Sequence, residues 1–402
     1  MLDNNEPLAS FENLRVEFDT KDGKVVAVED ISFEIKPQQT VCLVGESGSG
    51  KSVSSLSMMR LVEFGGGSLA GGKLIFNRGD KGSIDVAVSN QSQMRKIRGN
   101  EIGMIFQEPM TALNPVFTVE RQLTEGLIVH KGFSKSEAKK RAIELMTMAK
   151  IPEPERRLKQ FPHELSGGMR QRVVIAIALA CQPRLLIADE PTTALDVTIQ
   201  AEILALINRL KEETGTAVMF ITHDMAVVAQ MADRVVVMYQ GKKVEEGTVH
   251  EIFNNPQHEY TKSLLAAVPK LGEMASKKYP EPMRLVGEKK SKALKPIVGT
   301  NEPLLKVNNL VARYPVKGGV FRRTVARVHA VEDVSFTIMK GKTLSLVGES
   351  GCGKSTVGRS LIRLVEPTSG DVNLDGQNIL SLNPNDMREA RSNIQMVFQD
   401  PF

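Results

Sequence analysis

The sequence contains no tryptophan and few other aromatic residues, and its three cysteines are widely separated. Phe, Tyr and Trp together make up 5% of the 402 residues. Cys42, Cys181 and Cys352 form no Cys-x-x-Cys pair and have no histidine cluster beside them. This cysteine usage excludes a disulfide-stapled extracellular domain and a structural zinc site, and it is typical of a protein in a reducing cytosol.

Long hydrophobic runs and a strong net charge are also missing. The longest apolar run, residues 173–181, is far shorter than the ~20 residues that a membrane-spanning helix requires. The first ten residues are acidic and polar, unlike a secretory signal. A net charge of +5 is small for this length and argues against a nucleic-acid partner. If the protein works at a membrane, other subunits must therefore hold it there.

The chain contains an internal duplication. Residues 27–63 recur at 330–366, and more than half of the aligned positions are identical. In each copy an alternating apolar segment is followed by a turn, an apolar strand, and a glycine-rich loop that opens a helix. The sequence therefore predicts two related α/β domains in tandem.

The two copies differ in extent. The first continues through a full domain, which we predict to span residues 1–270. The next stretch, residues 271–303, is rich in proline and lysine with little apolar periodicity, and we interpret it as a linker. The second copy spans residues 304–402 and is shorter.

Both copies carry the pattern Gly-x4-Gly-Lys-Ser. Glycines let backbone N–H groups turn toward phosphate oxygens, and the helix N-terminus adds the positive end of its dipole. The lysine would neutralise phosphate charge and the next serine would bind Mg²⁺. The predicted nucleotide-binding residues are Gly45, Glu46, Ser47, Gly48, Ser49, Gly50, Lys51 and Ser52 in the first loop, and Gly348, Glu349, Ser350, Gly351, Cys352, Gly353, Lys354, Ser355 and Thr356 in the second.

An apolar strand in the first copy, RLLIADEPT, ends in two carboxylates. Asp189 is suited to the outer shell of Mg²⁺, and Glu190 to polarising a water for in-line attack. An acidic pair alone is more often a solvated turn, and a single histidine is more often structural. Here ALD follows at residues 194–196, and FITHD places His223 at the end of the next strand. The combination therefore favours a phosphate-hydrolysing site.

Two further pairs of residues repeat between the copies. Gln107 follows an apolar strand in IFQEP, and Gln399 follows one in VFQDP. Either amide could reach Mg²⁺ and the attacking water, although a plain strand end explains one copy equally well. Phe18 and Tyr314 precede the loops, where a ring could stack on adenine, but packing in a core is about as good an explanation.

Together these motifs resemble the ATP-binding cassette (ABC) ATPases. LSGGM in the first copy matches the signature of that family at Ser166, Gly167 and Gly168. The resemblance implies P-loop cassettes with a mixed sheet core and a helical subdomain, in which each ATP lies between the loop of one cassette and the signature of another. It implies catalytic roles for Glu190, His223 and Gln107, and Mg²⁺ ligation by Ser52, Gln107, Asp189, Ser355 and Gln399.

One branch of that family is especially similar. GESGSGKS, LSGGMRQRV and NPQHEYTKSLLAAVP resemble the peptide, nickel and glutathione importers, and two fused cassettes are most like the ATPase of glutathione importers. The resemblance implies an ATPase on the cytoplasmic face of a bacterial inner membrane, taking up glutathione or short peptides. Its partners would be two permease subunits and a periplasmic binding protein.

The signature follows only the first loop, and the sequence ends at Phe402, just after FQDP. We expect the second copy to lack the strand that would pair with residues 344–348, which exposes an apolar edge and prevents stable folding. A head-to-tail homodimer through the first cassette is then possible.

Two alternative functions stay open. The chain could be a partial product that binds ATP without driving transport. It could also be a soluble twin-cassette ATPase acting in translation, although such proteins are expected to carry a longer, charged, helical arm between the cassettes.

Overall fold

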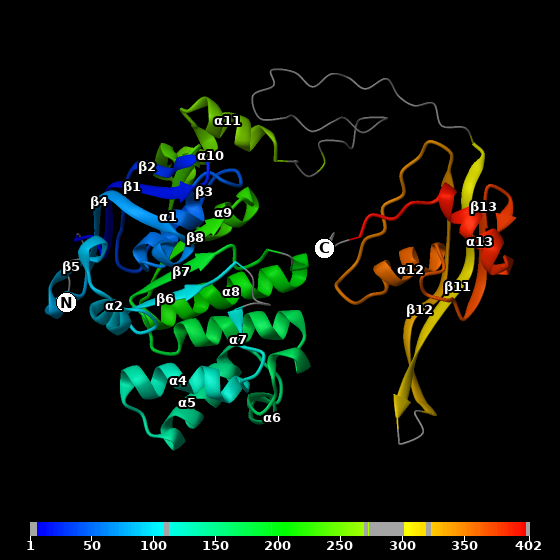
Figure 1. Ribbon diagram of the computed structural model, residues 1–402, viewed down its shortest axis with the longest axis horizontal. Helices are drawn as coiled ribbons and strands as arrows, with labels where there is room; N and C mark the ends of the chain where they lie inside the picture. The colour runs from blue at the N-terminus through cyan, green and yellow to red at the C-terminus, as the bar shows by residue number, and fades with distance from the viewer. Residues whose placement is uncertain are drawn as a thin grey trace. The chain divides into compact units, whose positions relative to one another are not determined.

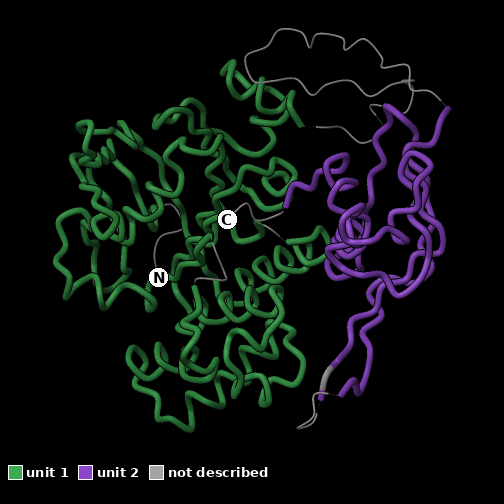
Figure 2. Tube along the Cα trace, turned by 45° about the vertical axis from the view of Figure 1, so that its right-hand side comes forward, with its two compact units in different colours: residues 1–293 green, residues 294–402 purple. Residues whose placement is uncertain are grey.

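The computed structural model describes residues 6–107, 112–193, 195–268, 272, 301–318 and 323–398. The chain divides into two compact units, residues 1–293 and 294–402 (Figure 2). Most of the predicted linker lies outside the described residues, as do Gln399 and residues 108–111. No helix in the described part is both long and apolar enough to cross a bilayer.

The first unit is organised around a six-stranded sheet with strand order β10-β9-β3-β8-β7-β6. Five of its strands are parallel, and β10 pairs antiparallel with β9 (Figure 1). Parallel strands end at the same edge of a sheet, so the loops that follow β3, β6, β7 and β8 converge there. The strands are β3 (Thr40–Val44), β6 (Ile102–Ile105), β7 (Leu185–Asp189), β8 (Ala217–Thr222), β9 (Arg234–Tyr239) and β10 (Lys242–Thr248).

Both faces of the five parallel strands are largely buried, which explains why these strands are mostly apolar runs. In β3, Cys42 and Val44 belong to one hydrophobic core, and Val41 and Leu43 belong to another. The first core is shared with the helices α4, α5, α7, α8 and α9, and the second with the antiparallel sheet and α1. The phosphate-loop segment thus starts from a rigid, fully buried strand.

The antiparallel sheet of the first unit has strand order β2-β1-β4-β5. Phe11 and Phe33 stack between adjacent strands with ring centroids 4.2 Å apart. Such cross-strand aromatic pairs stabilise the register of antiparallel strands. The strands are β1 (Ala9–Thr20), β2 (Gly23–Ile35), β4 (Gly67–Asn77) and β5 (Ser83–Asp85), with short 3₁₀ turns at Val62–Gly65, Gly79–Lys81 and Val86–Val88.

Helices complete the first unit, and α4, α5 and α6 gather at the end opposite the antiparallel sheet (Figure 1). Ser134 and Glu137 form a reciprocal capping box that fixes the start of α5. The helices are α1 (Lys51–Met58), α2 (Gln91–Ile97), α4 (Val119–Lys131), α5 (Lys135–Met148), α6 (Pro154–Leu158), α7 (Gly167–Leu179), α8 (Val197–Thr214), α9 (Met225–Met231), α10 (Val249–Asn254) and α11 (Glu259–Ala266), with a 3₁₀ turn at Pro162–Glu164.

The second unit repeats the antiparallel sheet, with strand order β12-β11-β13-β14. Asn13 donates to Asp30 in the first unit and Asn309 donates to Asp333 in the second, each at 2.5 Å. The internal repeat is therefore visible in side-chain contacts. The elements are β11 (Pro303–Gly318), β12 (Arg323–Met339), α12 (Lys354–Leu361), β13 (Ser369–Leu374), β14 (Gln377–Asn378) and α13 (Pro384–Ala390), with 3₁₀ turns at Ile379–Ser381 and Arg391–Asn393.

One predicted strand is absent from the described part of the second unit. Residues 342–349 form no strand, and Leu344, Leu346 and Val347 are 45%, 46% and 85% exposed. In the first unit the matching strand β3 is held between β8 and β9. The described part of the second unit offers no such neighbours, so the backbone groups of this segment have no ladder to join. The prediction of an apolar strand here was wrong, although a small core around Val307 and Val372 is formed.

Candidate functional site

The loop between β3 and α1 can be built only with glycine at particular positions. Gly45 and Gly50 have φ of 150° and 93°, and Gly48 has φ of 79°. A Cβ added to Gly45 would lie 2.1 Å from the carbonyl oxygen of Met238, and one added to Gly50 would lie 2.7 Å from that of Ala27. Side chains are therefore excluded by both backbone conformation and space.

Lys51 folds back into this loop. Its Nζ donates to the carbonyl oxygens of Gly45 at 2.9 Å and Glu46 at 2.6 Å, and to Ser49 Oγ at 3.3 Å. Burial lowers the pKa of Lys51, and the carboxylates of Glu190, Asp189 and Glu46 act in the opposite direction. The loop thus contains a buried ammonium group that a phosphate could accept as a counter-ion.

Ser52 and Asp189 meet next to this lysine. Ser52 Oγ donates to Asp189 Oδ1 at 3.0 Å, across the gap between α1 and the end of β7. Burial raises the pKa of Asp189 to about 6 from an ordinary value of 3.8. A hydroxyl and a carboxylate are oxygen ligands of the kind that Mg²⁺ takes in small numbers while it retains water and phosphate oxygens. This donor set therefore fits a magnesium ion.

Replacing Asp189 with Asn should change how stability depends on pH. Because the folded pKa is raised, the wild-type carboxyl favours folding below about pH 4 and loses that contribution as the pH rises through about 6. In chelator and without nucleotide, Asp189→Asn should gain stability over wild type between pH 4 and 7.5. The gain should be at most about 3 kcal/mol for the shift from 3.8 to about 6. Thermal unfolding across this range measures it, and a pH-independent difference would contradict the prediction.

Glu190 lies at the centre of a hydrogen-bonded group. Its Oε2 accepts from Gln107 Nε2 at 3.2 Å and from Thr193 Oγ1 at 2.9 Å, and its Oε1 lies 3.3 Å from His223 Nδ1. Its backbone is left-handed, with φ of 46°, and its N–H donates to the carbonyl of Ile221 at 3.0 Å. Residues from three separate loops therefore fix the orientation of one carboxylate.

The surroundings of Glu190 keep it ionised. Partial burial raises its pKa, but the hydrogen bonds with Thr193 and His223, together with the electrostatic influence of His223 and Lys51, outweigh burial and lower the pKa below its ordinary value. An ionised, oriented carboxylate can accept a proton from water. Asp189 and Glu190 are adjacent in sequence, yet their pKa values are shifted in opposite directions.

The LSGGM motif forms the start of α7. Ser166 is the N-cap residue, and its Oγ accepts from the N–H of Met169 at 3.3 Å. Gly167 and Gly168 are the first helical residues. Further along α7, the buried Gln171 donates to the carbonyl of Pro191, immediately after Glu190. This bond connects the signature helix to the acidic end of β7.

The second phosphate loop reproduces part of the first. Lys354 Nζ donates to the carbonyl oxygens of Gly348 and Glu349, each at 2.6 Å. The hydroxyl of Tyr314 lies 3.4 Å from Thr356 Oγ1, so this predicted aromatic does lie beside its loop. Ser355 is exposed.

Phe18, the corresponding aromatic of the first unit, has a different environment. It is partly buried against the core that includes β1, β2 and β4. Two of its ring carbons lie 2.8 and 2.9 Å from the position that a Cβ on Gly67 would occupy. Packing accounts for these contacts, and a role for Phe18 at adenine stays a prediction.

The structure thus joins Lys51, Ser52, Gln107, Asp189, Glu190 and His223 at one edge of the sheet. Sequence reasoning missed Thr193, although it is the residue next to the quoted ADEPT tract and was available as a donor. Gln399 and Ala194 lie outside the described residues.

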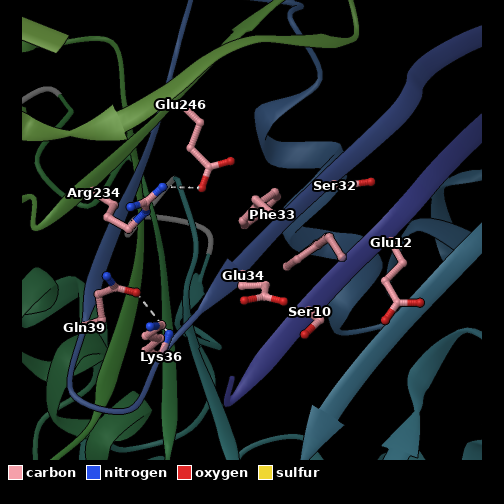
Figure 3. Close-up of a pocket in the computed structure, with 10 residues that line it drawn as sticks. Ser10, Glu12, Ser32, Phe33, Glu34, Lys36, Gln39, Arg234 and Glu246 are labelled. Atoms are coloured by element: carbon pink, nitrogen blue, oxygen red, sulfur yellow. Dashed lines mark hydrogen bonds and ion pairs between the residues drawn. The ribbon is translucent and has the colours of Figure 1, made fainter. Parts of the chain in front are cut away.

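A cavity of about 530 Å³ lies away from this site, between β1, β2, β9 and β10 (Figure 3). In it Arg234 donates to Glu246 at 3.0 Å, and the N–H of Lys36 donates to Gln39 at 3.1 Å. None of its lining residues is a predicted site residue.

Comparison with protein families identifies the chain. A family model described as "ABC transporter" matches residues 28–193 and 331–402. The chain belongs to the ABC transporter family. A second model, "Oligopeptide/dipeptide transporter, C-terminal region", matches residues 244–290. Membership of this family implies nucleotide binding.

Individual ABC relatives are similar over almost the whole chain. The "Glutathione import ATP-binding protein GsiA" of Escherichia coli K12 is 51% identical over 396 residues, which cover 97% of this chain and 64% of the relative. The protein of the same name from Shigella sonnei gives the same figures. The chain therefore spans less than two thirds of the length of these curated relatives.

Solved structures of ABC cassettes also match. A dimeric cassette, MJ0796, in a post-hydrolysis state bound to ADP and Pi has a TM-score of 0.53 and 30% identity, covering 60% of this chain and 98% of its own. The cbiO1 protein of Clostridium perfringens, part of an ABC transporter complex, has a TM-score of 0.52 and 27% identity, covering 62% and 92%. The predicted P-loop ABC cassette fold and importer-type family are confirmed.

Proposed function

We propose that the first unit binds ATP with Mg²⁺ and hydrolyses it, and that the hydrolysis drives import of glutathione or short peptides through a membrane complex. The observation that supports this proposal most directly is the environment of Glu190. Gln107, Thr193 and His223 orient its carboxylate, and Lys51 with Asp189 lies beside it. This arrangement provides a base next to a phosphate-binding loop.

Each residue contributes a defined step. Lys51 and the loop N–H groups bind and orient phosphate oxygens. Ser52, Asp189 and Gln107 would hold Mg²⁺, which neutralises phosphate charge when bound. Glu190 accepts the proton of the attacking water. The Nδ1 atom of His223 lies 3.3 Å from Glu190 Oε1 and helps to orient the carboxylate.

The transported molecule is proposed from relatives. Proteins that are 51% identical are named as glutathione import ATP-binding proteins, and the C-terminal match is to an oligopeptide/dipeptide transporter region. We accordingly propose two permease subunits and a periplasmic binding protein as partners. The chain would lie at the cytoplasmic face of the inner membrane as a peripheral subunit.

We also propose that the complete site forms between two cassettes. Ser166 lies at the exposed N-terminus of α7, where backbone N–H groups could bind the γ-phosphate held by a second molecule. The similar MJ0796 structures are dimeric cassettes. A head-to-tail pair would place each Ser166-Gly167-Gly168 on the Lys51 loop of its partner.

An uptake experiment tests the transport proposal. Cells of the source organism that lack this gene should take up little labelled glutathione. The wild-type gene should restore uptake and Lys51→Ala should not, because the substituted loop has lost its cation. Competition with unlabelled dipeptides and Ni²⁺ identifies the preferred substrate. Uptake that is equal with and without the gene would contradict the proposal, and ATP binding without uptake would favour the alternative that the chain binds ATP without driving transport.

The same cells test the proposed location. The protein should be recovered in washed membranes only when permease subunits are present. Retention in membranes from cells that lack every such permease would contradict a peripheral, permease-held subunit.

A further inference from the structure

The C-terminal helix of the first unit, α11, contacts the phosphate loop. The backbone N–H of Glu46 donates to the hydroxyl of Tyr260, on α11, at 3.0 Å. Tyr260 is only 6% exposed, and its ring lies 4.3 Å from that of Tyr239 at the end of β9. A residue more than two hundred positions away in sequence therefore satisfies a loop N–H.

Tyr260 is itself held firmly. The carboxylate of Glu245 accepts from the N–H groups of Gln257 at 2.7 Å and His258 at 3.0 Å, just before α11. The side chain of His258 then caps the helix, accepting from the N–H of Tyr260 at 3.2 Å. Glu245 follows an irregularity in the β9–β10 pairing, between Lys243 and Glu245. These contacts anchor α11 to the hairpin of β9 and β10.

The hairpin of β9 and β10 contacts the phosphate loop as well. The N–H of Gly241 donates to the carbonyl of Ser49 at 3.2 Å. The carbonyl of Met238 leaves no room for a side chain on Gly45. The phosphate loop therefore rests on a support made of the hairpin and α11.

The chemistry of Lys51 explains why the Tyr260 contact matters. An ammonium group has three donors, and Lys51 directs its Nζ at three loop acceptors, Gly45 O, Glu46 O and Ser49 Oγ. Contact with a phosphate requires at least one of these acceptors to be released. The bond from the N–H of Glu46 to Tyr260 does not involve Lys51, so it can hold Glu46 in place during that exchange.

We infer that Tyr260 is a positioning residue for the phosphate loop, and that α11 is thereby part of the nucleotide site. The inference rests on the proposed ATP binding by the first unit. Because binding linkage is reciprocal, nucleotide on the loop should also tighten the docking of α11. The C-terminal segment, whose sequence matches a transporter-specific region, thus senses whether the loop holds nucleotide.

Tyr260→Phe tests this in the full 402-residue chain, because it removes the hydroxyl and keeps the stacked ring. The matched control is Tyr239→Phe, whose hydroxyl contacts Gln240 Nε2 at 3.3 Å rather than the loop. We expect Tyr260→Phe to weaken MgATP binding by roughly 5- to 10-fold, since the partly buried hydrogen bond to the N–H of Glu46 is lost. Tyr239→Phe should stay within about two-fold of wild type, as expected for an exposed hydrogen bond. Isothermal titration calorimetry gives both dissociation constants.

Hydrogen exchange provides a readout that a purely structural role would not affect. MgATP should slow exchange in residues 257–268 of wild type and of Tyr239→Phe, and this slowing should be lost in Tyr260→Phe. Equal affinities for the two variants, or undiminished slowing in Tyr260→Phe, would overturn the inference. So would nucleotide-free Tyr260→Phe melting well below Tyr239→Phe, because the affinity loss would then reflect general instability.

Lys51→Ala separates this inference from the proposed function. If wild type and Lys51→Ala bind MgATP equally, the nucleotide site is wrongly placed, and both the proposed function and the inference fail. If Lys51→Ala abolishes binding while Tyr260→Phe leaves it unchanged, the inference alone is wrong.

Discussion

Glu190→Gln should slow ATP hydrolysis by about 10²–10⁴-fold, the range expected for loss of a general base. The amide is nearly the same shape as the carboxylate, and its oxygen can still accept from Thr193. It cannot take a proton from water at neutral pH. MgATP affinity should therefore stay close to that of wild type, because Lys51 and the loop are unchanged. Steady-state phosphate release and equilibrium binding measure the two effects separately.

A matched control is available on α8. Glu202 is an exposed carboxylate that pairs with Arg172 away from the loop, so Glu202→Gln makes the same chemical change without touching the site. It should keep wild-type turnover. Lys51→Ala should show the opposite behaviour to Glu190→Gln by losing nucleotide affinity. Equal turnover of wild type and Glu190→Gln would remove Glu190 from the role of base.

The Glu190→Gln chain should also change from monomer to dimer when MgATP is added. The γ-phosphate would bridge the Lys51 loop of one molecule and Ser166 of the other, and slow hydrolysis would trap the pair. Light scattering should show the mass doubling with MgATP and returning to the monomer value in chelator. Adding Lys51→Ala to the same chain should abolish the change, since the bridging nucleotide is lost.

The Glu190→Gln chain shortened to residues 1–270 tests which unit forms the dimer interface. Its dimer should persist, because the second unit supplies no signature motif among its residues. Dimerisation of the 402-residue chain alone would show that the second unit takes part. If neither chain dimerises at any ATP concentration, the first cassette does not complement itself.

The sequence predicted the arrangement of the candidate residues where local pattern and topology agree. Gly-x4-Gly-Lys-Ser requires one backbone shape, and the φ values of Gly45 and Gly50 show it. Parallel strands end at a common edge, so Gln107, Asp189 and His223 meet although they are far apart in sequence. Successive residues of β3 point into two different cores, because the strand is buried on both faces.

Prediction failed where the structure of a segment depends on its contacts with distant parts of the chain. Residues 342–349 have the same apolar pattern as β3 but no strand neighbours among the described residues, so their propensity alone forms no strand. The Tyr260–Glu46 bond joins distant segments and has no local pattern. Phe18 and Tyr314 occupy equivalent positions, yet only Tyr314 is seen to contact its loop, because the packing around each ring differs.

The left-handed backbone of Glu190 has a cost in stability. A φ of 46° disfavours any residue with a side chain, typically by about 1–2 kcal/mol, and glycine would relieve it. On stability alone glycine would be the better residue here, whereas the proposed hydrolysis requires the carboxylate. Under the proposed function, Glu190 thus serves turnover at some expense of fold stability, and a chain no longer required to hydrolyse ATP would be free to lose this carboxylate.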